Sequence, residues 1–105
     1  MSYIYIIKNT VNDKVYIGKT CKSIKERFTE HIYSAKTAEY RFKRVLYLAM
    51  NKYGIDKFYV EELECDLTDE QACEKEQYYI SQYRSYVGFD DCNGYNMTLG
   101  GDGTV

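Results

Sequence analysis

Residues 3–18 read Tyr-Ile-Tyr-Ile-Ile-Lys-Asn-Thr-Val-Asn-Asp-Lys-Val-Tyr-Ile-Gly, and the fold can be predicted outward from them. Two runs rich in Tyr, Ile and Val, residues 3–7 and 15–17, flank a polar segment with Asn12 and Asp13 as its turn residues. This pattern predicts a β-hairpin. A hairpin alone is marginal in water, and both of its faces are apolar, so other elements must cover each face.

Alternation along the two strands brings two tyrosines together. Successive side chains point to opposite faces, so Tyr5 shares a face with Ile7, and Tyr16 shares one with Gly18. If the register pairs these faces, the two phenols lie side by side, next to a glycine that lets another backbone or a ligand approach closely. The hairpin is therefore a candidate floor for an active site.

The rest of the chain predicts three helices and one more strand. Two capping boxes, Ser-x-x-Glu and Thr-x-x-Gln, mark helix starts, and an amphipathic stretch before a glycine marks another helix. The expected helices cover residues 24–36, 40–53 and 68–83, and the expected strand covers residues 58–63. We predict an α/β (α+β) fold in which a small three-stranded antiparallel sheet is flanked by three helices.

Composition favours one intracellular domain. The chain has 105 residues and 45% hydrophobic content, and no apolar run approaches the ~20 residues of a membrane span. No signal peptide is visible. The four cysteines are far apart and the chain has one histidine, which makes a structural zinc site a poor interpretation and predicts free thiols.

Charge is divided between the two halves of the chain. Residues 1–57 carry 12 Lys/Arg against 5 Asp/Glu, and residues 58–105 carry 2 against 11, which gives the overall −2. The basic half offers a surface for phosphates, whereas the acidic half offers oxygen ligands for a hard cation and weakens duplex binding. Arg41, Lys43 and Arg44 could touch phosphates or form a solvated face, and the sequence leaves both readings open.

Three side chains on the helices have chemical potential. Arg27 and His31 lie one turn apart on the first helix and are expected to face the sheet. They could equally be an arginine paired with a carboxylate and a core histidine. Glu76 lies at the centre of an apolar stripe, and burying a lone carboxylate costs several kcal/mol in order-of-magnitude terms. An ion pair with Arg27 and a metal ligand are both compatible with this position.

Short motifs follow one another along nearly the whole chain. Two tripeptides lie about ten residues apart, followed by an Arg/His pair, a glutamate on the last helix and a late Gly-Tyr-Asn. They are Tyr3-Ile4-Tyr5, Tyr16-Ile17-Gly18, Arg27 with His31, Glu76, and Gly94-Tyr95-Asn96. In this order they resemble the GIY-YIG nuclease family over roughly residues 3–101, most closely its homing and phage-type endonucleases. Tyr3 takes the place of the family's first glycine.

The resemblance implies metal-dependent hydrolysis of DNA, with Mg²⁺ or Mn²⁺ as the cofactor. It implies that Tyr5 and Tyr16 act as base or hold the attacking water, that Arg27 binds the phosphate, that His31 shuttles a proton or orients Tyr16, and that Glu76 is the metal ligand. The supporting residues that it implies are Gly18, Lys19 and Asn96, the last by orienting Glu76 or its helix. Since a phenol titrates near ~10, a base role requires Lys19, Arg27 or the metal to lower the tyrosine pKa.

The expected organisation is a nuclease domain over residues 1–98, followed by a Gly-rich tail or linker over residues 99–105. The tail lacks the Lys and Ser/Thr of a phosphate-binding loop. We expect the partner to be DNA, and we expect no membrane association. Either a DNA-recognition module that is absent from this chain selects the target, or the chain is a stand-alone nuclease of low specificity. The rival interpretations are a catalytically silent nucleic-acid-binding domain and a structural interaction module.

Overall fold

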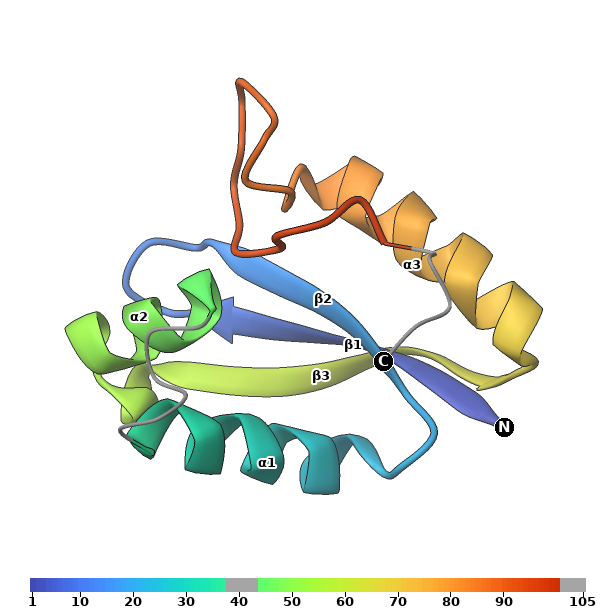
Figure 1. Cartoon of the computed structure of the whole chain (residues 1–105), viewed down its shortest axis with the longest axis horizontal. Coiled ribbons are helices and arrows are strands. Elements are labelled where there is room, and N and C mark those ends of the chain that lie inside the picture. Colours follow the sequence, from blue (N-terminus) through green and yellow to red (C-terminus); the bar gives the residue numbers. More distant parts are fainter. Residues whose placement is uncertain (38–43, 101–105) are drawn as a thin grey trace.

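A computed structural model describes residues 1–37 and 44–100. The elements in chain order are β1 (Ser2–Asn9), β2 (Val15–Thr20), α1 (Ile24–Lys36), α2 (Val45–Tyr53), the short 3₁₀ helix η1 (Ile55–Lys57), β3 (Phe58–Leu67) and α3 (Asp69–Tyr83). Within these described residues, three α-helices accompany a three-stranded antiparallel sheet (Figure 1). The predicted fold class is therefore confirmed.

The sheet has the order β2-β1-β3, so the first strand of the hairpin is its centre. In the β1–β2 pair Tyr5 lies opposite Gly18 and Ile7 lies opposite Tyr16, which confirms the predicted pairing of faces. β3 pairs with β1 and continues to Leu67, four residues beyond the expected end. Register shifts beside Ile4 interrupt the two-residue alternation there, which explains why the pattern underestimates this strand.

Each face of the sheet is covered by its own helices (Figure 1). One core cluster joins Tyr5, Ile7 and Tyr16 to side chains of α1 and α2, whereas the other joins Ile4, Ile6 and neighbours to α3. The two apolar faces of the hairpin are thus both buried, as the sequence requires.

Two of the helices begin where their caps predict. The Ser23 hydroxyl accepts the Glu26 amide at the start of α1, and Thr68 and Gln71 form a complete capping box at α3. The prediction for α2 is wrong at Arg44, which is its extended N-cap rather than a helical residue, and residues 40–43 of that prediction lie outside the described part of the chain.

The segment after α3 returns to the hairpin and pairs with the free side of β2 (Figure 1). The Val15 amide donates to the Asn93 carbonyl at 3.1 Å, and the Tyr95 amide donates to the Val15 carbonyl at 2.9 Å. A Cβ on Gly94 would lie 2.3 Å from the Val15 oxygen, so only glycine permits this approach. The sheet edge beside the second tripeptide is therefore covered.

None of the helices in the described part of the chain combines the length and hydropathy of a membrane-spanning helix. The four cysteines all lie in that part and are free thiols.

Candidate active site

A cleft of about 230 Å³ opens beside the two hairpin tyrosines. Its walls come from the hairpin, α1, the start of α2, α3 and the segment after α3. The predicted site residues that line it are Tyr5, Tyr16, Gly18, Lys19, Arg27, Glu76 and Asn96. His31 lies behind this wall, fully buried and in contact with Tyr5. The fold thus gathers side chains that are up to 91 residues apart in the sequence.

Gly18 has a different role from the one expected. Its missing side chain does not leave room for a ligand, because the Tyr5 ring crosses directly over it. A Cβ on Gly18 would lie 2.3 Å from both Cζ and Oη of Tyr5. The glycine of the second tripeptide therefore sets the position of the tyrosine of the first.

His31 links two tyrosines through its two ring nitrogens. Nε2 lies 2.8 Å from the Tyr5 hydroxyl and Nδ1 lies 2.9 Å from the Tyr47 hydroxyl. Burial, followed by the charges of Arg27 and Arg44, lowers the pKa of His31 to about 3. The ring is therefore neutral near pH 7, so one nitrogen donates while the other accepts, and a proton can enter at one tyrosine as another leaves at the other.

Tyr16 lies beside this chain and is held from the opposite side. Its ring centroid is 6.4 Å from that of Tyr5, and its hydroxyl accepts a hydrogen bond from Nη1 of Arg44 at 3.0 Å. Burial raises the pKa of Tyr16 and raises that of Tyr5 further, although Arg27 and Arg44 act in the opposite direction on both. In the protein alone both tyrosines are therefore phenols, and the arginines do not produce the lowered pKa that a base role requires.

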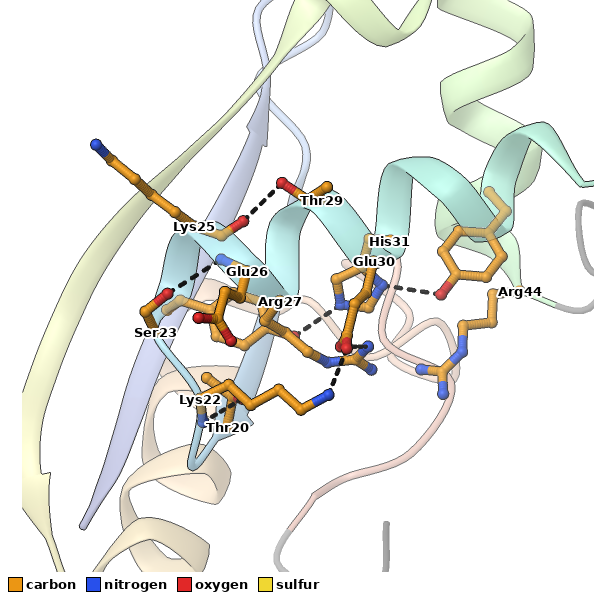
Figure 2. Close-up of polar contacts among 12 residues, drawn as sticks. Thr20, Lys22, Ser23, Lys25, Glu26, Arg27, Thr29, Glu30, His31 and Arg44 are labelled. Carbon is orange, nitrogen blue, oxygen red and sulfur yellow. Dashed lines mark hydrogen bonds and ion pairs between the residues drawn. The ribbon is translucent and has the colours of Figure 1, made fainter.

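Arg27 lies at the mouth of the cleft and pairs with a carboxylate of its own helix. Nη1 lies 3.2 Å from Oε1 of Glu30, and Lys22 contacts the other oxygen of Glu30 (Figure 2). The Arg27 side chain is 24% exposed, which leaves its planar donors within reach of a phosphate in the cleft. The carboxylate in this pair is Glu30, whereas the sequence left an Arg27–Glu76 pair open as one of two interpretations.

Glu76 is half-buried on α3 and lines the cleft, while its stripe neighbours Ala72 and Ile80 are buried against the sheet. Residues 1–37 and 44–100 contain no group of three or more His, Cys, Asp or Glu side chains that could hold a metal. The Glu76 carboxylate is of a type that Mg²⁺ or Mn²⁺ accepts, because such ions keep most of their water and take one or two carboxylates together with substrate phosphates. A single carboxylate in an open cleft is a suitable donor set.

The two supporting polar residues, Asn96 and Lys19, both contact neighbouring elements of the site. The Asn96 amide group accepts from the Ile17 amide at 2.8 Å and donates to the Ile17 carbonyl at 2.7 Å, so it holds β2 where we expected it to orient Glu76. Lys19 reaches the cleft and also lies 3.1 Å from Sγ of Cys73 on α3. Both residues fix the strand that carries Tyr16.

Sequence reasoning missed two contacts made by α2. The sequence leaves Arg44 as a phosphate contact or a solvated charge, and Tyr47 is not among the predicted site residues. In the structure the first bonds Tyr16 and the second bonds His31. Their spacing of three residues, which puts both on one side of a helix start, is the signal that could have grouped them.

The model of the GIY-YIG catalytic domain matches residues 1–96. The chain therefore belongs to the GIY-YIG family. It has the fold of a nuclease catalytic domain. The solved catalytic domain of the homing endonuclease I-TevI is 28% identical, with a TM-score of 0.73 over 93% of this chain and 99% of that one. A mutant of the catalytic domain of the intron endonuclease I-TevI is also 28% identical, with a TM-score of 0.72 over 92% of this chain and 93% of that one.

A curated relative extends the comparison to a viral protein. The uncharacterized protein 019R of Invertebrate iridescent virus 6 is 36% identical over 100 residues, which are 91% of this chain and 33% of that protein. The chain thus spans about a third of the length of this relative.

Proposed function

We propose that this chain is a DNA endonuclease domain that hydrolyses phosphodiester bonds with Mg²⁺ or Mn²⁺. The observation that carries the proposal is the cleft in which Tyr5, Tyr16, Arg27 and Glu76 converge. A cleft lined by a planar cation, a carboxylate and two hydroxyls offers charge neutralisation and water activation, the two requirements of phosphodiester hydrolysis.

Each of these groups has a separate part in the proposed reaction. Glu76 would hold the divalent ion, which supplies charge neutralisation at the phosphate. Arg27 donates to the phosphate oxygens, and Tyr16 holds the attacking water by a hydrogen bond from or to its hydroxyl. Since burial keeps Tyr16 protonated in the free protein, we assign it to positioning the water until substrate and ion add positive charge around it.

The buried chain of hydrogen bonds from Tyr5 through His31 to Tyr47 holds the Tyr5 hydroxyl in the cleft. A neutral imidazole bonded at both nitrogens accepts at one while it donates at the other, so this orientation needs no charged histidine. Gly18, Lys19 and Asn96 keep Tyr5 and β2 in place for this chemistry.

We further propose a homing-type organisation. Residues 1–98 would form the nuclease domain, and residues 99–105 would begin a linker to a DNA-recognition module. The family match over residues 1–96 and the threefold greater length of the viral relative support this arrangement. Substrate choice would then depend on that module, with weak DNA affinity in the present domain.

Nicking of supercoiled plasmid at low salt tests the proposed activity. The parent chain should nick the plasmid with Mg²⁺ or Mn²⁺, and nicking should stop when the metal is chelated. The control variant Glu74→Gln, which changes an exposed glutamate on the helix that carries Glu76, should behave in the same way. Glu76→Gln should not nick, and its free energy of unfolding should stay near that of the parent. An inert parent, or cleavage that survives chelation, contradicts the proposal. A loss of several kcal/mol on Glu76→Gln would instead favour a structural ion pair.

A further inference from the structure

Arg44 makes a contact that the proposed reaction does not use. It is the N-cap of α2, with φ −135° and ψ 143°, and its side chain makes no capping hydrogen bond. Instead Nη1 donates to the Tyr16 hydroxyl at 3.0 Å, and Cζ lies 5.9 Å from the centroid of the Tyr47 ring. Figure 2 shows this side chain reaching toward the site from the start of α2, across from Arg27.

The chemistry of the two groups fixes the direction of the bond. A guanidinium has only donors, so the Tyr16 oxygen must accept here, and its own O–H must point away from Arg44. Tyr16 is only 9% exposed, which limits the water molecules that could compete for this oxygen. Arg44 therefore decides which side of the Tyr16 hydroxyl is left for another partner.

We propose that Arg44 is a positioning residue that orients the Tyr16 hydroxyl toward the attacking water. This inference rests on the proposed function, in which Tyr16 holds that water. The proposal explains how the start of α2 contributes to the site. Arg44 bonds Tyr16. Tyr47, three residues later, bonds His31, which in turn bonds Tyr5. One turn at the start of α2 thus fixes both tyrosines of the hairpin.

The contact itself can be tested without nuclease activity. In protein labelled at the tyrosine ζ carbons, the Tyr16 resonance, assigned with Tyr16→Phe, reports the hydrogen bond to its oxygen at pH 7. Arg44→Gln should move this resonance, and Arg44→Lys, which keeps a charged donor, should restore part of the shift. Lys52→Gln, which removes a cation from the far end of α2, should leave it unchanged. A Tyr16 resonance that does not respond to Arg44→Gln overturns the inference.

Single-turnover cleavage with saturating protein tests the consequence. Arg44→Gln should lower the maximal rate by roughly 10-fold to 100-fold, as expected when a reacting group loses its orientation, with DNA affinity equal to that of Lys52→Gln. Arg44→Lys should recover part of the rate. If Arg44 is instead a phosphate contact, Arg44→Gln lowers DNA affinity and reduces the slope of log affinity against log salt concentration by about 1. The maximal rate then stays unchanged, and this result overturns the inference. An inert parent overturns the proposed function, and the NMR result still decides the Arg44 contact.

Discussion

At the scale of single residues, Glu30 pairs with Arg27, which lines the cleft, and with Lys22, which lies outside it. Its carboxylate lies between Lys22 and Arg27 on the accessible side of α1 (Figure 2). A DNA phosphate that enters the cleft must compete with this carboxylate for the Arg27 donors, because both offer oxygens of matching geometry. In the proposed reaction, the Arg27–Glu30 contact therefore has to be exchanged for a contact between Arg27 and the phosphate.

Glu30→Gln should strengthen DNA binding. Removing the carboxylate releases Lys22 and Arg27 for phosphates, so affinity at low salt should rise several-fold and the salt slope should steepen by about 1. Stability should change little, because exposed ion pairs contribute little to folding. Fluorescence anisotropy with a short duplex measures both effects, with Glu74→Gln as the control for lost negative charge. Equal affinities for the two variants would contradict the exchange.

His31 makes the free energy of unfolding depend on pH on the acidic side of neutrality. The unfolded chain binds a proton at His31 near pH ~6.5, whereas the folded chain, with a pKa of about 3, does not. Folding stability is therefore complete above that value and falls as the pH decreases toward 3.

Urea unfolding at pH 7.0 and pH 5.5 should differ by about 1 kcal/mol, with the lower stability at pH 5.5. The chain has one histidine, so His31 is the one imidazole that can account for this loss. Equal stability at the two pH values, or greater stability at pH 5.5, would show that His31 is protonated in the folded protein.

At the scale of elements, the hairpin and the segment after α3 hold the reacting groups through two glycines. Gly18→Ala should displace the Tyr5 ring, since the new Cβ would lie 2.3 Å from its Cζ. We expect cleavage to fall roughly 100-fold, with a stability loss of about 1–3 kcal/mol.

Gly94→Ala meets the Val15 carbonyl and Ser85, both less able to move, so it should cost more stability. Cleavage rates and urea unfolding of both variants check this, and an active Gly18→Ala enzyme would contradict the assigned role.

Asn96→Asp should destabilise the protein by about 2–3 kcal/mol at pH 7. A carboxylate can still accept from the Ile17 amide but cannot donate to the Ile17 carbonyl, so a buried acceptor loses its partner. Asn93→Asp is the matched control, because its side chain is exposed on the same segment. Urea unfolding that does not distinguish the two variants would contradict the assigned role of Asn96 in holding β2.

The sequence predicts these elements well wherever local chemistry defines them. The hairpin pattern and the caps at Ser23 and Thr68 act within a few residues, so they locate β1, β2, α1 and α3. The end of β3 is set by pairing with β1, which is distant in sequence, and the start of α2 carries no capping side chain. Tertiary contacts decide both, so periodicity alone misplaces them.

At the scale of the whole molecule, the site is made by bringing five parts of the chain together. The residue types that carry the proposed chemistry are visible in the sequence, because their motifs occur in a recognisable order. Their contacts are not, since Arg44 bonds a tyrosine 28 residues away and Asn96 bonds a strand 79 residues away. Pairing between distant segments is fixed only by the assembled core.

The charge distribution of the molecule sets a further requirement on any activity. Basic side chains of the first half line the cleft beside the carboxylate of Glu76 from the acidic half. A duplex therefore meets both attraction and repulsion, and general basicity alone would not explain the proposed cleavage. We therefore assign the proposed activity to specific groups in the cleft.

The most direct measurement of this claim compares two cations on α1 in single-turnover cleavage of a duplex with Mg²⁺ at low salt. Arg27 lines the cleft, whereas Lys25 is exposed on the same helix outside it. Arg27→Ala should lower the maximal rate by about 100-fold or more, while Lys25→Ala should change mainly the affinity. Equal losses in the two variants, or a parent chain that cleaves no DNA, would contradict the account.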